Sequence, residues 1–147
     1  MGIGPVQLGD SLTSVLQNPT TNSSSNDLDW CPVVFGDLGG TPLVAAKAWD
    51  SAGMNVDALF LFNWEGGEPT STPTTSAGVG MGSTRAQVEQ GHPNGVWADL
   101  DPDHEFELSA KYVTSLDTTT LTFGFRDDRV TAISLGPGTV FPYEFCG

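Results

Sequence analysis

Hydrophobic and polar residues alternate most regularly in the second half of the chain. Residues 120–126 (TLTFGFR) and 130–135 (VTAISL) have this pattern, and Asp127-Asp128-Arg129 lies between them. Alternation with a period of two is typical of a β-strand, and two such strands around a short acidic turn predict a β-hairpin. Residues 106–113 alternate in the same way and predict another strand.

The first half of the chain contains shorter apolar segments. Residues 56–64 (VDALFLFNW) are apolar at both odd and even positions, which predicts a central strand covered on both faces. Residues 43–49 (LVAAKAW) predict a second strand, and residues 30–35 (WCPVVF) predict an edge strand because Pro32 cannot donate a ladder hydrogen bond. We expect 3–8 to form a strand or turn, and 137–147 to form a terminal edge strand.

A short pattern occurs twice, 73 positions apart. Leu8-Gly9-Asp10-Ser11 with Val15, and Met81-Gly82-Ser83-Thr84 with Val88, each give an apolar residue, a glycine, a capping residue, a hydroxyl residue and a valine. We interpret this as a duplicated unit that opens with a short helix, capped by Asp10 or Ser83. The alternative is coincidence, since these residue types are common.

Together these patterns predict an α+β fold. Each of two tandem units would be a short helical segment followed by about three antiparallel strands, with the helices on one face of the sheet. The first unit would span residues 1–64 and the second 78–147. Residues 65–77 (EGGEPTSTPTTSA) have the composition of a linker.

The charge of the chain restricts its partners. Eighteen acidic and five basic residues give a net charge of −13. Repulsion from phosphate groups argues against binding to nucleic acids or to anionic lipid surfaces, and favours a basic partner or cations. No segment approaches the roughly 20 apolar residues that span a bilayer.

The two cysteines, Cys31 and Cys146, predict one disulfide. On the chain-entropy model, a bridge that closes the chain between residues 31 and 146 stabilises the fold by roughly 4–5 kcal/mol. Two buried free thiols are the alternative. The low lysine content, the abundance of Thr, Ser, Gly and Pro, and a cysteine near the end of the sequence favour an exported protein. No signal peptide is visible, so we expect a mature chain without its leader or an artificial start.

One acidic loop is a candidate calcium site. Its acids stand at every second position, as side-chain oxygens that converge on a hard cation can do. The candidate ligands are Asp99, Asp101, Asp103 and Glu105. However, His104 stands where a calcium loop has glycine, and Ala110 where it has glutamate, so a solvated acidic loop is the alternative. No other cofactor is expected.

No catalytic residue can be predicted. His92 and His104 are the only histidines, and neither has a second ligand at a zinc-binding spacing. No nucleophile elbow selects a serine for a triad. Glu105 and Glu107 share a strand face and could do acid–base work, but solvation at a sheet edge is the simpler explanation.

Tryptophan is frequent for a chain of this length, at positions 30, 49, 64 and 97. Most of these rings are expected to fill the core, but a tryptophan presented by a loop often anchors a partner. Trp49 and Asp50 begin a loop that ends at Met54, and Trp97 lies in the acidic loop. These four residues, Trp49, Asp50, Met54 and Trp97, are the predicted binding residues.

The repeated opening resembles that of a known superfamily. Beta-lactamase inhibitory proteins and SmpA/OmlA-type envelope lipoproteins begin their units with "L-G-x-[ST]-x-x-x-V", and the segments 78–88 and 125–136 are similar to phrases in secreted proteins of actinobacteria. The resemblance implies tandem units, secretion, and a loop placed like 50–54 that inserts into a target. The inhibitors carry a disulfide within each unit, whereas this chain has at most one.

These observations predict a secreted or cell-envelope, non-enzymatic protein-binding module, with inhibition of an extracellular enzyme as one form of that activity. An extracellular protein is the expected partner. A small secreted hydrolase, a carbohydrate-binding module and a calcium-stabilised surface protein are the alternatives.

Overall fold

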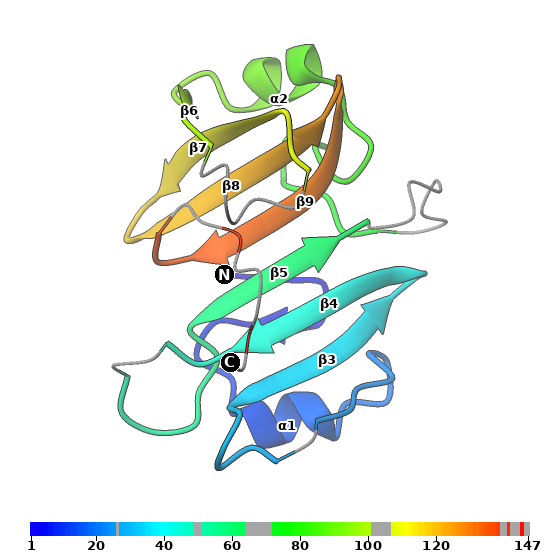
Figure 1. Ribbon diagram of the computed structural model, residues 1–147, viewed down its shortest axis with the longest axis vertical. Coiled ribbons are helices and arrows are strands. Elements are labelled where there is room, and N and C mark those ends of the chain that lie inside the picture. Colours follow the sequence, from blue (N-terminus) through cyan, green and yellow to red (C-terminus); the bar gives the residue numbers. More distant parts are fainter. Residues whose placement is uncertain are drawn as a thin grey trace.

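A seven-stranded antiparallel sheet organises the chain (Figure 1). The computed structural model describes residues 1–25, 27–48, 51–63, 72–100, 107–138, 141 and 145. The strand order is β3-β4-β5-β9-β8-β7-β6. The strands are β3 (Val33–Leu38), β4 (Thr41–Ala46), β5 (Ala58–Phe62), β6 (Val96–Ala98), β7 (Ala110–Leu116), β8 (Thr119–Arg126) and β9 (Arg129–Gly136). A separate two-stranded sheet joins β1 (Gly2–Ile3) to β2 (Val6–Gln7).

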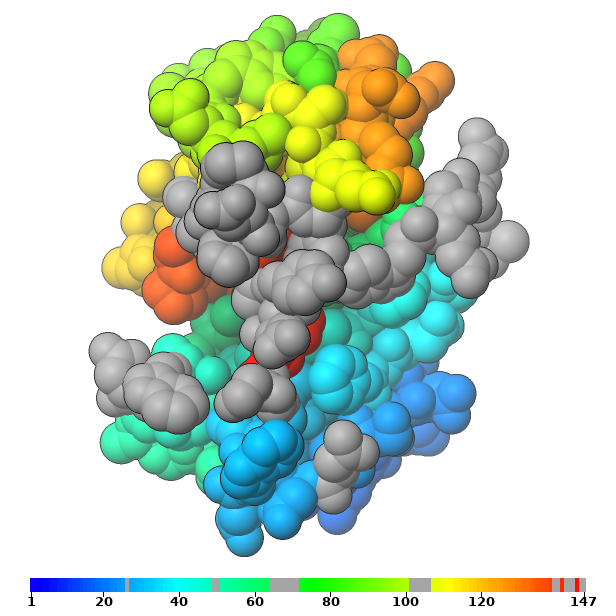
Figure 2. All heavy atoms as spheres, in the orientation of Figure 1, coloured from blue at the N-terminus to red at the C-terminus, as the bar shows by residue number. Residues whose placement is uncertain are grey.

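Most neighbouring strands of the large sheet follow one another along the chain. The exception is the central pair, β5 and β9, in which Leu59 lies opposite Leu135 and Phe62 opposite Ala132. This pair joins the strands before residue 63 to the strands after residue 95. Figure 2 shows the result, with N-terminal residues gathered at one end of the molecule and most later residues at the other.

Two short helices lie at opposite ends of the sheet (Figure 1). They are α1 (Leu12–Leu16), which contacts β3 and β4, and α2 (Arg85–Gly91). Their N-caps are Ser11 and Thr84, one position later than predicted. Asp10 and Ser83 instead close the preceding turns, by accepting hydrogen bonds from the backbone N–H groups of residues 7 and 80.

The predicted fold class is wrong. The structure is mostly β, and five-residue and seven-residue helices are too small to make it an α+β arrangement of two helix-then-strands units. The helices stop early because Pro19 and Pro93 follow soon after each cap and restrict the residues before them. The boundaries predicted for the two units stay a prediction, and most of the predicted linker lies outside the described residues.

The first face of the sheet carries the larger hydrophobic cluster. Aliphatic side chains dominate it, including Leu43, Leu59, Leu61, Ile133 and Leu135, all of them buried. Its cover consists of side chains from α1, α2, the N-terminal hairpin β1-β2 and the segment 79–81. We call this cluster and its cover the first face.

The second face carries a smaller cluster that is rich in phenylalanine. Phe60 and Phe62 of β5 stack with their ring centroids 6.1 Å apart. Phe141 lies 6.2 Å from Phe62, and Phe145 lies 5.2 Å from Phe60, both edge-on. We call this cluster the second face. Because β5 is buried on both sides, its prediction as a central strand is confirmed.

The hairpin predicted around Asp127-Asp128 is also confirmed. Strands β8 and β9 pair from Thr120 opposite Gly136 to Arg126 opposite Arg129. Asp127 has a φ of 55°, a left-handed conformation that aspartate tolerates better than most residues. The acidic turn therefore fits the geometry that a two-residue hairpin loop requires.

Two further expectations concern the membrane and the cysteines. In the part of the chain that the structure describes, no helix has the length and hydropathy to cross a bilayer. Cys31 is buried in the second face, and no free cysteine occurs among the described residues. Phe145 packs against the same cluster and precedes Cys146 in the sequence. This supports the Cys31–Cys146 disulfide, which stays a prediction because Cys146 lies outside the described residues.

Candidate functional site

An exposed tryptophan lies on the edge strand β6. Trp97 is 41% exposed, and its neighbour Val96 is 63% exposed. Trp97 lies beside α2, since it contacts Arg85 and Glu89 of that helix, and Val96 precedes it on the same strand. We call Arg85, Glu89, Val96 and Trp97 the Trp97 surface.

The ring of Trp97 is held from several sides despite its exposure. Its Nε1 donates a hydrogen bond to Glu89 Oε1 at 2.7 Å. The ring centroid lies 5.0 Å from that of Tyr112 and 5.3 Å from that of Phe125. The guanidinium of Arg85 lies 5.3 Å from the same centroid, within the range of a cation–π contact. The ring is therefore fixed in one orientation before any partner arrives.

Only Trp97 of this surface was predicted from the sequence, and of the three residues that were missed, Arg85 makes the most contacts. It occupies the first position of α2, and its Nε and Nη2 donate to the backbone oxygen of Asp127 at 3.1 and 2.9 Å. The Asp128 carboxylate accepts from the Arg85 backbone N–H at 3.4 Å. The turn between β8 and β9 thus positions Arg85, and Arg85 positions Trp97. An arginine that follows a cap is too common a signal to predict this arrangement.

The two edges of the sheet differ in their pairing. Along β3, Ser24 and Phe35 exchange backbone hydrogen bonds of 2.7 and 2.9 Å, and Asp37 donates to Thr21 at 2.7 Å. Within the described ranges, β6 pairs only with β7. Among the described residues, the outer edge of β6 therefore has no strand partner, unlike that of β3.

Of the other predicted binding residues, the structure describes only Met54. Met54 is half-buried and packs against the first face, so it is not an exposed anchor. Trp49 and Asp50 lie outside the described residues, so their role stays a prediction. Trp30, at the start of the predicted edge strand 30–35, is 68% exposed.

The candidate calcium site is described at one residue. Asp99 is exposed, whereas Asp101, Asp103 and Glu105 lie outside the described residues. Among the residues that are described, no three acidic, histidine or cysteine side chains are close enough to hold a metal ion. Calcium binding by this loop stays a prediction.

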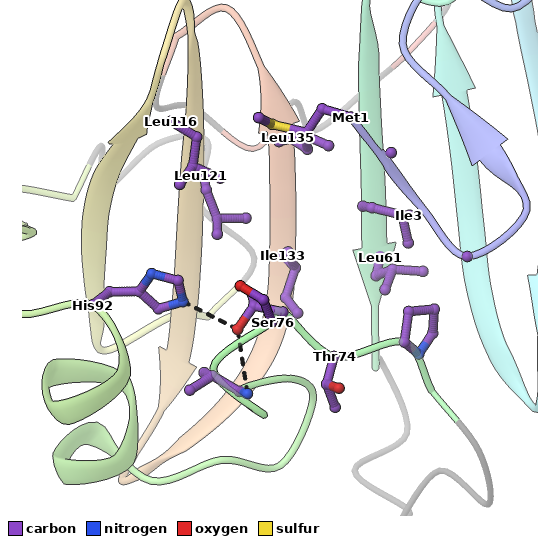
Figure 3. A pocket seen from close by; sticks show the side chains of 15 residues that line it. Met1, Ile3, Leu61, Thr74, Ser76, His92, Leu116, Leu121, Ile133 and Leu135 are labelled. Carbon is purple, nitrogen blue, oxygen red and sulfur yellow. Dashed lines mark hydrogen bonds between the residues drawn. The ribbon is translucent and has the colours of Figure 1, made fainter.

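A separate apolar cavity of about 350 Å³ lies on the first face (Figure 3). Leu61, Leu121 and Ile133 form its floor on β5, β8 and β9, and Ile3 reaches it from the N-terminal hairpin. His92, the C-cap of α2, points toward Thr75, and its Nε2 lies 3.2 Å from Thr75 Oγ1.

At the polar corner of this cavity, His92 is held in place and its ring is uncharged. The backbone oxygen of His92 accepts from the Tyr112 hydroxyl at 2.8 Å, which holds the end of α2 against the sheet. Its ring centroid lies 5.4 Å from that of Phe123. Burial lowers the pKa of His92 below its ordinary value of 6.5, so the ring is neutral at pH 7.

Comparison with known proteins adds no relative. No family model matches the chain, and neither the curated proteins nor the solved structures contain a match. The resemblance to beta-lactamase inhibitory proteins and envelope lipoproteins therefore stays a prediction.

Proposed function

We propose that the chain is a non-enzymatic protein-binding module, exported or held in the cell envelope, that engages its partner through the Trp97 surface. The observation that carries this proposal is the combination of exposure and rigidity at Trp97. The ring is 41% exposed and is already held by Glu89 and Arg85. A rigid aromatic anchor loses little conformational entropy on binding, which is one reason tryptophan is enriched at interface hot spots.

The edge of β6, which pairs only with β7 among the described residues, supports a mode of binding. A partner that contributes an extended segment can pair with this edge while one of its apolar side chains packs on Trp97. The net charge of −13, with Glu89 and Asp99 exposed near this edge, favours a partner segment that carries basic residues. Inhibition of an extracellular enzyme is one activity that such binding would produce.

The test compares two exposed tryptophans. The wild-type chain, Trp97→Ala and Trp30→Ala are immobilised, and proteins captured from the extracellular fraction of the source organism are identified. The affinity of each captured protein is then measured by calorimetry. We expect Trp97→Ala to weaken the true partner at least tenfold, about 1.4 kcal/mol or more, and Trp30→Ala to change it less than twofold.

Two outcomes contradict the proposal. One is a captured partner whose affinity is the same for wild type and Trp97→Ala, with circular dichroism showing both to be folded. The other is equal loss of affinity in both variants, which would mean that a general apolar attraction, and no specific anchor, accounts for the binding.

A hydrolase is the second candidate, and the contact between His92 and Thr75 is what favours it. A nucleophile and base need this proximity. However, the Val79 backbone N–H already donates to Thr75 Oγ1 at 3.3 Å, and no carboxylate contacts His92 among the described residues. Hydrolysis of a p-nitrophenyl ester by wild type that is lost in His92→Gln would favour this candidate over the binding module.

A further inference from the structure

The cavity on the first face occurs where the two short helices fail to meet. At 1.5 Å per residue, α1 and α2 are only about 8 and 11 Å long, and they lie at opposite ends of the sheet (Figure 1). The middle of the face, over β5 and β9, is left to the N-terminal hairpin and to residues 73–79. These segments enclose a space of about 350 Å³, which is within the range of small-molecule sites.

The walls of the cavity are aliphatic. Leu61, Leu121, Ile133 and Leu135 line it, and each is no more than 5% exposed. These aliphatic walls offer no hydrogen bonds to water, so this part of the cavity favours an apolar occupant. An aliphatic hydrocarbon chain is therefore the ligand group that suits these walls.

One end of the cavity is polar. Ser76 and His92 lie there (Figure 3), and Thr75 Oγ1 is 3.2 Å from His92 Nε2. Ser76 is exposed, so this end faces the outside. Thr75 Oγ1 accepts from the Val79 backbone N–H and shares a hydrogen bond with His92 Nε2. A hydroxyl group supports three hydrogen bonds in all, so one position on Thr75 Oγ1 remains for a ligand.

The polar end carries no positive charge. Burial keeps the pKa of His92 below its ordinary value, so its ring is neutral near pH 7. The chain as a whole carries a net charge of −13, which repels a carboxylate or phosphate headgroup. The ligand that fits is therefore uncharged.

We propose that this cavity is a binding site for a medium-chain aliphatic alcohol, with the hydrocarbon chain on Leu61, Leu121 and Ile133 and the hydroxyl group on Thr75. This inference does not depend on the proposed function of the Trp97 surface, which lies on the edge strand β6 and contributes no residue to the cavity.

The experiment uses octanol as the probe and follows the methyl NMR signals of Leu61, Leu121 and Ile133. We expect saturable shifts at these methyl groups with octanol. Octanoate, which has the same chain length and a negative charge at about pH 7.5, should bind at least about tenfold more weakly. Both measurements use the wild-type chain and require no variant to fold.

A shape-conserving variant tests the polar end. Thr75→Val removes the hydroxyl group and keeps the side-chain volume, and we expect it to weaken octanol about fivefold to tenfold, the effect of one hydrogen bond. Xenon, which needs only apolar walls, should shift the same methyl groups equally in wild type and Thr75→Val. Thr118→Val, in the exposed turn between β7 and β8, is the matched control and should behave like wild type.

The proposal is overturned if octanol produces no saturable shift at these three residues, or if octanoate binds as tightly as octanol. It is also overturned if Thr75→Val binds octanol like wild type. Trp97→Ala should leave octanol binding unchanged, so this site and the Trp97 surface can fail separately.

Discussion

Strands β3, β4 and β5 contribute side chains to both the first face and the second face of the sheet. The two faces are nevertheless covered by different parts of the chain. On the first face, aliphatic side chains lie under helices and segments that precede residue 93. On the second face, phenylalanines of β5 meet Phe141 and Phe145 from the far end of the sequence. Alternation along a strand assigns side chains to a face, but it does not say what will cover them.

This difference explains where space remains. Phenylalanine rings that meet edge-on fill the second face with large rigid groups. The cover of the first face is made of short elements, and it leaves the cavity above β5 and β9. The described cavity thus lies on the face with more buried aliphatic residues.

The largest expected effect compares one phenylalanine from each face. Phe123 is fully buried on the first face and Phe60 is 7% exposed on the second. Phe123→Ala should lower the free energy of unfolding by about 4 kcal/mol, because the substitution leaves a cavity that rigid strands cannot close. Phe60→Ala should cost about 1 kcal/mol less, because Phe60 is partly exposed and loses fewer buried contacts. Urea denaturation of both variants measures the difference.

The comparison of faces would be wrong if Phe60→Ala destabilised the chain as much as Phe123→Ala. That result would mean that the packing around Phe60 contributes as much to stability as the packing around Phe123.

A smaller effect is expected at the cap of α2, which covers one end of the first face. Thr84 Oγ1 accepts from the Gln87 backbone N–H at 3.2 Å, and Gln87 Oε1 accepts from the Thr84 N–H at 2.8 Å. Thr84→Ala should lower the free energy of unfolding by about 1 kcal/mol, and Thr84→Ser should retain most of it. Equal thermal midpoints for all three chains would show that the cap does not hold this cover in place.

The smallest effect is a dependence on pH at the same end of the first face. Burial lowers the pKa of His92 in the folded chain below 6.5, so the unfolded chain binds more protons in the acidic range. The contribution of the neutral ring to stability is present above pH 6.5 and is lost as the pH falls below it. Thermal midpoints between about pH 5 and 8 should therefore decline less on acidification for His92→Gln than for wild type. A steeper decline for the variant would contradict this assignment.

Local signals in the sequence predicted the local parts of the fold. The acidic turn at Asp127 and the strand 56–64 were both found, because each depends on residues close in the chain. The helices were predicted at the right places but with their caps one residue early. Asp10 and Ser11 are both good caps, and only the turn before α1 decides which of them is used.

Contacts between distant segments could not be predicted. The cavity exists because Ile3, Leu61, His92 and Ile133 meet, and no periodicity links these positions. The fixed position of Trp97 depends on Arg85, which is placed by the turn at Asp127. The fold class was wrong for a related reason, since a helical pattern reveals where a helix begins but not that the sheet will outweigh it.

The central strand pair has a consequence for how the molecule acquires its shape. Every other neighbouring pair in the large sheet consists of strands that are consecutive in the chain. By contrast, β5 and β9 can pair only after the whole segment 63–128 has formed a loop. Closing so long a loop costs entropy before any contact compensates for it. Pairing of β5 with β9 should govern the folding rate, so substitutions at Leu59 of β5 should slow refolding more than substitutions in β8, which pairs with β9 locally.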